Sequence, residues 1–152
     1  MSDEQRTKLH ETFKDTFMGT KKYHNYTRDM DPNKNAANRF MLELTANDFM
    51  YVNYKTFDVT DASDPEALEF VHFFLKGQSF LYNQIRKMVG SMIQLFHGDL
   101  HSSQFLDNSF KDNGVNIALA PGDGLMLEKV DYGRYNEFNT TKKNDVMLQR
   151  VT

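Results

Sequence analysis

The stretch KGQSFLYNQIRKMVGSMIQLFHG, residues 76–98, joins the end of a predicted strand to a long amphipathic helix. We predict the helix over residues 81–96, because its apolar side chains recur on one face of a wheel with 3.6 residues per turn. These side chains are Tyr82, Ile85, Met88, Val89, Met92, Ile93 and Phe96. The opposite face has Arg86, Lys87 and Gly90. An interior glycine weakens a helix by about 1 kcal/mol relative to alanine, so Gly90 indicates that another segment approaches closely there.

The helical wheel leaves two interpretations of Arg86 open. In the first, its guanidinium lies on a solvent-exposed face, and the glycine one turn later is merely tolerated. In the second, Arg86 lies at the contact that Gly90 indicates, because the two residues are four apart on the same stripe of the helix. The second interpretation makes Arg86 a candidate functional residue, but the wheel alone assigns it no chemistry.

The composition is that of a globular protein, with 39% hydrophobic, 26% charged and 13% aromatic residues in 152. No apolar run reaches the roughly 20 residues of a membrane span, and the charged start MSDEQRTKLHE has no signal-peptide core. The chain has no cysteine, which excludes disulfides and thiolate metal sites. We therefore expect an intracellular protein without a membrane partner. The net charge of −3 means that any contact with nucleic acid must rest on local basic clusters such as Lys21-Lys22.

The remaining patterns predict a single α+β domain over residues 1–152, with a mostly antiparallel sheet and the long helix packed on one face. Residues 4–18 predict a helix, because Leu9, Phe13 and Phe17 repeat every four positions. The further predicted elements are strands at 38–46 and 49–59 joined by an Asn47-Asp48 hairpin turn, a central strand at 67–76, a short helix at 102–110, and strands on both sides of a Pro121–Gly124 turn.

Histidines supply the other candidate site residues. His24 lies in the run KKYHNY, a mixture of cations and aromatic rings that can contact phosphates and stack on bases. A solvated surface loop explains the same run equally well. His97 and His101 are four residues apart, as in a metal pair on a helix, but Gly98 interrupts that helix and no further ligand cluster accompanies them. We therefore expect no metal.

Three separated blocks resemble the C-terminal half of TruA-class tRNA pseudouridine synthases. The blocks are KGQSFLYNQIRKMVG at residues 76–90, LAPGDGLMLEKVDY at 119–132, and GTKKYHNYT at 19–27. The third block is similar to the GTHNFHNFT segment of the eukaryotic branch of that family, and the tail GRYNEFN at 133–139 resembles the same branch. The blocks follow the family's order and span nearly the whole chain.

The resemblance implies an α+β fold that supplies half of a larger antiparallel sheet, with the active-site cleft between two halves. It also implies a reaction without a cofactor, in which a uridine of tRNA is detached at N1, rotated and rejoined through C5. The family's catalytic group is an aspartate, and its basic partner in the Gln-Ile-Arg segment is Arg86 here. Gly90 would then let a second domain approach. The resemblance assigns substrate binding to His24, Asn25, Lys87 and Leu125.

One departure from the family pattern limits what this chain can do. The catalytic aspartate belongs to an Arg-Thr-Asp block in the N-terminal half, and the sequence has no such block. We therefore expect a C-terminal part of the catalytic domain that is inactive alone and has tRNA and the missing half as partners, in the nucleus, the mitochondrion or the cytoplasm. Two alternatives are a non-catalytic RNA-binding module and a metal-dependent enzyme that uses His97 and His101.

Overall fold

The computed structural model describes residues 1–28, 30–96, 104–111 and 114–133. It divides into two compact units, Met1–Gly122 and Asp123–Thr152. The first unit holds all the helices and strands of the described residues and confirms the α+β class. In the second unit, the described residues 123–133 form neither helix nor strand and are exposed. Across the described ranges, no helix has the length and apolar character that crossing a membrane requires.

The first helix, α1, spans Asp3–Phe17 and confirms the prediction from residues 4–18. Its N-terminus is a capping box, in which the Ser2 hydroxyl accepts from the Gln5 backbone and the Gln5 side chain accepts from the Ser2 backbone. The three side chains that repeat every four residues, Leu9, Phe13 and Phe17, are buried. The apolar stripe therefore sets which face of α1 packs on the sheet.

The predicted hairpin with a turn at Asn47-Asp48 is wrong, because β2 is one continuous strand of 16 residues, Asn38–Asn53. It pairs antiparallel with β4, Ala67–Gly77, and the register shifts by one residue between Thr45 and Asp48. Such a shift is a β-bulge, which places an extra residue in one strand without ending it. The Ala46 amide inside the bulge donates to His10 Nδ1 of α1 at 3.1 Å. The bulge thus accommodates the polar dipeptide that suggested a turn.

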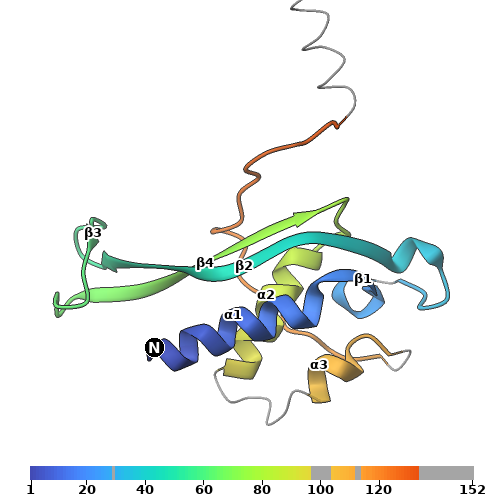
Figure 1. Cartoon of the computed structure of the whole chain (residues 1–152), viewed down its shortest axis with the longest axis horizontal. Helices are drawn as coiled ribbons and strands as arrows, with labels where there is room; N and C mark the ends of the chain where they lie inside the picture. Colours follow the sequence, from blue (N-terminus) through green and yellow to red (C-terminus); the bar gives the residue numbers. More distant parts are fainter. Residues whose placement is uncertain (29, 97–103, 112–113, 134–152) are drawn as a thin grey trace, which may run out of the picture. The chain divides into compact units, whose positions relative to one another are not determined.

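The strand predicted at 67–76 is present as β4, but its predicted central position is wrong, because the central strand of the sheet is β2. Short strands β1, Gly19–Lys22, and β3, Val59–Thr60, pair with the two ends of β2. Strand β4 pairs with β2 alone among the described residues. Figure 1 shows β1 and β3 at opposite ends of the long β2–β4 ribbon. The apolar run of β4 therefore reflects one packed face and one face that is half exposed.

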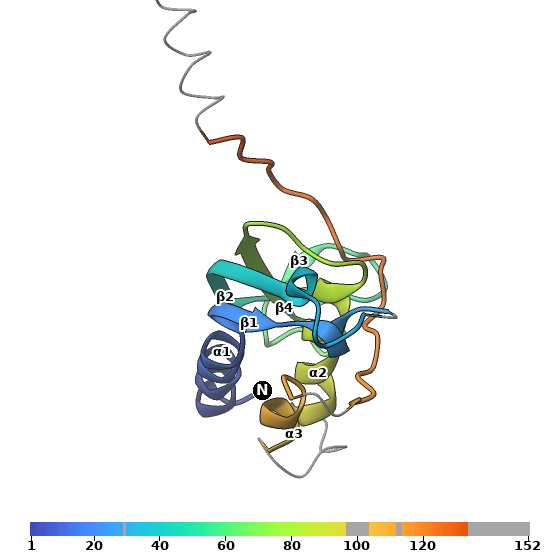
Figure 2. The same cartoon turned by 90° about the vertical axis from the view of Figure 1, so that its right-hand side faces the viewer.

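Helices α1 and α2, Gln84–Phe96, lie on the same face of the sheet (Figures 1 and 2). The predicted start of α2 at residue 81 is wrong, because Asn83 has a left-handed φ of 61°. The side chain of Gln84 accepts from the Leu81 backbone at 2.8 Å and is fully buried. Tyr82, which was expected on the apolar face of the helix, is 73% exposed in the preceding turn.

The C-terminal strands predicted around the Pro121–Gly124 turn are also wrong, since residues 114–133 contain no strand. The short helix predicted at 102–110 is present as α3, Gln104–Asn108. Between α3 and the end of the first unit, the Ala118 amide bonds the Gln94 side chain of α2, and the Ala120 amide and carbonyl bond Arg86 of α2. Those bonds replace the ladder that a strand would have formed.

The core contains a cluster of rings in which Tyr23 and Tyr26 are fully buried. The Tyr23 hydroxyl donates to the Phe17 carbonyl at 2.9 Å, and the Tyr26 hydroxyl lies 2.6 Å from Ser109 Oγ. Burial raises the pKa of both tyrosines well above the ordinary value of 10. The folded state therefore binds more protons than the unfolded state at pH values above about 10, where unfolded tyrosines ionise.

We expect the free energy of unfolding to fall as the pH rises above 10, by up to about 1.4 kcal/mol per pH unit for each buried tyrosine. Below pH 10 these tyrosines should add no pH dependence, because both states keep them protonated. Urea unfolding at pH 8, 10 and 11 measures the effect. Tyr23→Phe combined with Tyr26→Phe should flatten the loss, and Tyr54→Phe, at a half-exposed ring, should leave it unchanged. An equal slope in all three proteins would contradict the assignment.

Candidate active site around Arg86

Arg86 lies in the first turn of α2 and is half buried against the chain's own C-terminal segment. Its Nε donates to the Ala120 carbonyl at 2.8 Å, and the Ala120 amide donates back to the Arg86 carbonyl at 3.1 Å. This reciprocal pair of bonds fixes both the backbone and the guanidinium. Of the two interpretations that the wheel left open, the structure shows the packed one.

The close contact predicted at Gly90 is present, but it is made by the backbone of Ala118 and Ala120 of this chain and not by a second domain. A Cβ added at Gly90 would lie 2.1 Å from the Ala118 carbonyl oxygen, well inside any real Cβ contact. One turn further along α2, Gln94 Oε1 accepts from the Ala118 amide at 3.1 Å. We call residues 118–122 the strap. The strap runs antiparallel to α2 over a stripe formed by Arg86, Gly90 and Gln94. These residues are spaced by four and therefore lie on one face of the helix, and this spacing is visible in the sequence.

The guanidinium of Arg86 is held at one nitrogen and is without a counter-charge among the described residues. None of the ion pairs formed within the described ranges involves Arg86. A Cβ added at Gly122, the last residue of the strap, would lie 3.5 Å from Cζ of Arg86. The strap therefore positions the guanidinium by backbone groups while its two terminal nitrogens form no bond to described residues. A planar cation presented in this way suits a carboxylate, which accepts two parallel hydrogen bonds from it.

Lys87 points from α2 to the preceding 3₁₀ turn η1, His24–Tyr26. Its Nζ donates to the carbonyls of Asn25 and Thr27 at 3.0 and 3.1 Å. Burial lowers the pKa of Lys87. The Thr27 hydroxyl also donates to the Tyr82 carbonyl at 2.9 Å, just before α2 begins. These bonds join η1 to the start of α2, so η1 and Arg86 belong to one rigid region.

His24 and Asn25 lie inside the protein, 6% and 9% exposed. His24 Nε2 is 2.6 Å from the Lys111 carbonyl, a contact that requires the Nε2–H tautomer. Asn25 donates to the Ser109 carbonyl at 2.9 Å and accepts from the Val115 amide at 3.2 Å. The contacts that the structure shows are therefore internal, and substrate binding by these two residues stays a prediction. The rings beside them are buried as well, so the KKYHNY run is neither a solvated loop nor a base-stacking surface.

The last predicted substrate-binding residue, Leu125, belongs to the second unit and is 48% exposed there.

His97 and His101 lie outside the described residues, so the metal-dependent alternative is not tested. Within the described ranges, no three His, Cys, Asp or Glu side chains gather as a metal site would require.

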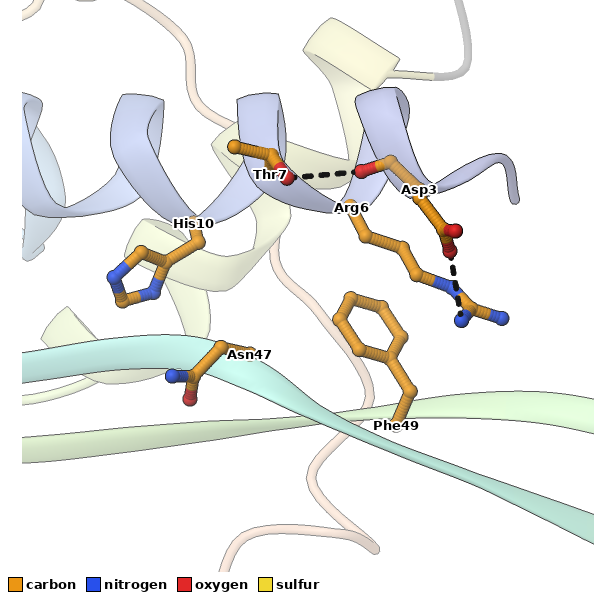
Figure 3. Close-up of a pocket in the computed structure, with 6 residues that line it drawn as sticks. All are labelled: Asp3, Arg6, Thr7, His10, Asn47 and Phe49. Atoms are coloured by element: carbon orange, nitrogen blue, oxygen red, sulfur yellow. Dashed lines mark hydrogen bonds and ion pairs between the residues drawn. The ribbon is translucent and has the colours of Figure 1, made fainter.

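A shallow cleft of about 320 Å³ lies away from the Arg86 site, between α1 and β2 (Figure 3). Its lining residues are Asp3, Arg6, Thr7, His10, Asn47 and Phe49. The cation in this cleft is already paired, because Arg6 binds Glu69 with Nη2 and with Nε at 2.8 Å. The guanidinium also lies 4.9 Å from the Phe49 ring centroid. The residues that line the cleft therefore include no unpaired guanidinium comparable to that of Arg86.

Comparison with known proteins decides the family. A family profile described as tRNA pseudouridine synthase matches residues 15–133, a range that includes Arg86, η1 and the strap. The chain belongs to the tRNA pseudouridine synthase family. The resemblance read from the three sequence blocks is thereby confirmed.

Individual relatives agree with the family profile. The pseudouridylate synthase 1 homologs of Mus musculus and Homo sapiens are each 35% identical to this chain over 121 residues, which is 80% of the chain and 25% of the relative. The tRNA pseudouridine synthase 1 of Yarrowia lipolytica is 28% identical over 137 residues, 90% of this chain and 23% of the relative. The chain thus spans about a quarter of the length of these relatives.

Proposed function

We propose that this chain is the C-terminal part of the catalytic domain of an enzyme that isomerises uridine to pseudouridine in tRNA. The observation that supports the proposal most directly is the state of Arg86. Its guanidinium is positioned by the strap through Ala120 and has no carboxylate partner among the described residues. Membership of the family supports the reaction class, and the names of the relatives support tRNA as the substrate.

The reaction rearranges one nucleotide and adds no atoms. The bond between C1′ and N1 breaks, the base rotates, a bond forms between C1′ and C5, and the proton on C5 is lost while N1 gains one. The catalytic aspartate would come from the part of the protein that precedes this sequence. Arg86 would keep that carboxylate ionised in a partly buried site and fix its rotamer through two parallel hydrogen bonds.

The other predicted residues take supporting roles in this proposal. His24, Asn25 and Lys87 would place η1 beside Arg86 and so shape the wall of the cleft that receives the nucleotide. Leu125 would pack near the target base. No cofactor is needed, since the chemistry is an internal rearrangement, and the nucleus or the mitochondrion is the proposed location.

A chimera tests the proposal. In it, residues 15–133 of this chain replace the matching segment of the mouse pseudouridylate synthase 1 homolog. We expect the chimera to form pseudouridine in tRNA, measured as release of tritium from C5-labelled uridine, and we expect the 152-residue chain alone to form none. The mouse protein is the positive control, and thermal unfolding of the chimera verifies that it folds.

Two results would contradict the proposal. A folded chimera that binds tRNA without forming pseudouridine would favour the non-catalytic RNA-binding alternative. Robust turnover by the isolated chain would show that catalysis does not depend on an aspartate outside this sequence.

A further inference from the structure

Two cations face each other across the antiparallel pair of β1 and β2. Lys21 of β1 is directly opposite Arg39 of β2. Side chains of directly opposed residues lie on the same face of the sheet, with Cβ atoms about 5 Å apart. Like charges in this arrangement destabilise a sheet unless something between them lowers the repulsion.

Both side chains are held by neutral partners. Lys21 Nζ lies 5.2 Å from the centroid of the Phe110 ring. Arg39 Nη1 donates to the carbonyls of Ala36 and Asn38 at 2.7 and 2.6 Å, and its buried Nε has no hydrogen-bond partner among the described residues. These partners fix the positions of the two cations without cancelling their charge.

A third cation, Lys111, is the next residue after Phe110, whose ring lies beneath the Lys21 ammonium group. Its side chain is exposed, and its Nζ donates to the amide oxygen of Asn108 at 2.9 Å. Two other basic residues, Arg6 and Lys55, are instead paired with Glu69 and Glu66. We define Lys21, Arg39 and Lys111 as the β1-end surface. In a chain with a net charge of −3, these three positive charges form a local cluster, and none of them takes part in an ion pair formed within the described ranges.

The β1-end surface belongs to the same rigid region as Arg86. Strand β1 leads directly into η1, whose carbonyls accept from Lys87, the neighbour of Arg86. The carbonyl of Lys111 is 2.6 Å from His24 Nε2 of η1. A polyanion held at the three cations would therefore be held in a defined position relative to the guanidinium.

We propose that the β1-end surface binds the sugar–phosphate backbone of the RNA that presents its uridine to Arg86. This inference rests on the proposed function, since it takes the polyanion to be tRNA. Positively charged side chains on rigid elements suit phosphates, because each contact releases condensed counterions and positions the RNA without reading its sequence. The surface would thus contribute affinity and register, while the Arg86 site acts on the base.

The test measures binding of tRNA to the 152-residue chain by fluorescence anisotropy between 20 and 200 mM salt. We expect binding to weaken as the salt concentration rises, because each phosphate contact releases condensed counterions. Removal of one contact lowers the magnitude of the slope of log K against log salt by about 0.7–0.9. Lys21→Gln combined with Lys111→Gln should lower the slope by roughly 1.5 and weaken binding about tenfold at 100 mM salt. The matched control, Lys8→Gln combined with Lys55→Gln, removes the same net charge away from this surface and should leave the slope unchanged.

Three results would overturn the inference. One is the absence of tRNA binding by the chain at 20 mM salt, and another is an equal loss of slope in the control variant. The third is binding of polyglutamate or of phosphatidylserine vesicles as tight as that of tRNA and equally sensitive to the double substitution, which would assign the surface to an acidic protein or a membrane. The outcome is separable from that of the proposed function, because the chimera is scored by isomerisation and this chain by binding.

Discussion

Arg86→Ala in the chimera is expected to reduce pseudouridine formation by roughly a hundred- to several-thousandfold. Removing one partner of a buried ion pair leaves the other charge uncompensated, which costs about 3–5 kcal/mol, and each 1.4 kcal/mol is a tenfold change in rate. Affinity for tRNA should change by less than about threefold, since backbone phosphates supply most of it. Single-turnover kinetics with labelled tRNA, together with the binding assay, separate the two quantities.

Arg86→Lys is the matched variant for this prediction. Lysine keeps the positive charge but loses the planar fork that binds a carboxylate through two bonds and the Nε that donates to Ala120. We therefore expect an intermediate rate, above that of Arg86→Ala and below that of the parent chimera. Parental turnover in Arg86→Ala would refute the assignment of Arg86 as the partner of the catalytic aspartate.

Gly90→Ala is expected to destabilise the chain by roughly 1–3 kcal/mol, although alanine is the better helix former by about 1 kcal/mol. The added Cβ would lie 2.1 Å from the Ala118 oxygen and 2.9 Å from the Ala118 carbonyl carbon. Both atoms belong to the backbone, so no change of rotamer can relieve the overlap. The strap must move away from α2, and the two bonds between Arg86 and Ala120 are expected to break.

Urea unfolding of the 152-residue chain measures the change in stability, and hydrogen exchange at the Ala120 amide reports the strap. That amide should exchange faster in Gly90→Ala. Gly122→Ala is the control, because its Cβ would be 3.5 Å from the nearest atom of Arg86, an ordinary contact. Stabilisation by Gly90→Ala, with unchanged exchange at Ala120, would mean that the strap does not pack on the stripe of α2.

The helices show how far local pattern alone can predict this fold. The spacing of four in Leu9, Phe13 and Phe17 identified α1 to within one residue at each end, because a helix stripe is set by residues close together in the chain. The same reasoning predicted α2 through its last described residue, Phe96. It misplaced its start, since the left-handed Asn83 depends on the contacts of the preceding turn.

The strands show where local pattern fails. Asn47 and Asp48 have the chemistry of a turn, yet they lie at a bulge within one long strand. Pairing with β4, some 25 residues away, and the hydrogen bond between Ala46 and His10 decide between the two outcomes. Likewise, the alternating residues 115–120 read as a strand, but the last three of them belong to the strap that lies along α2, because Gly90 opens a backbone-sized space there.

The sequence by itself determined the family and the α+β class, through its helical and strand periodicities and through motifs that are contiguous in the chain. It also singled out Arg86 and Gly90 within one stretch. Only the tertiary structure decided what those two residues touch. The bond from Arg86 to Ala120 joins residues 34 apart, and the burial of His24 depends on residues more than 80 positions away. Such contacts exist only after the sheet, α2 and the strap have packed together, because they depend on distances that no local pattern specifies.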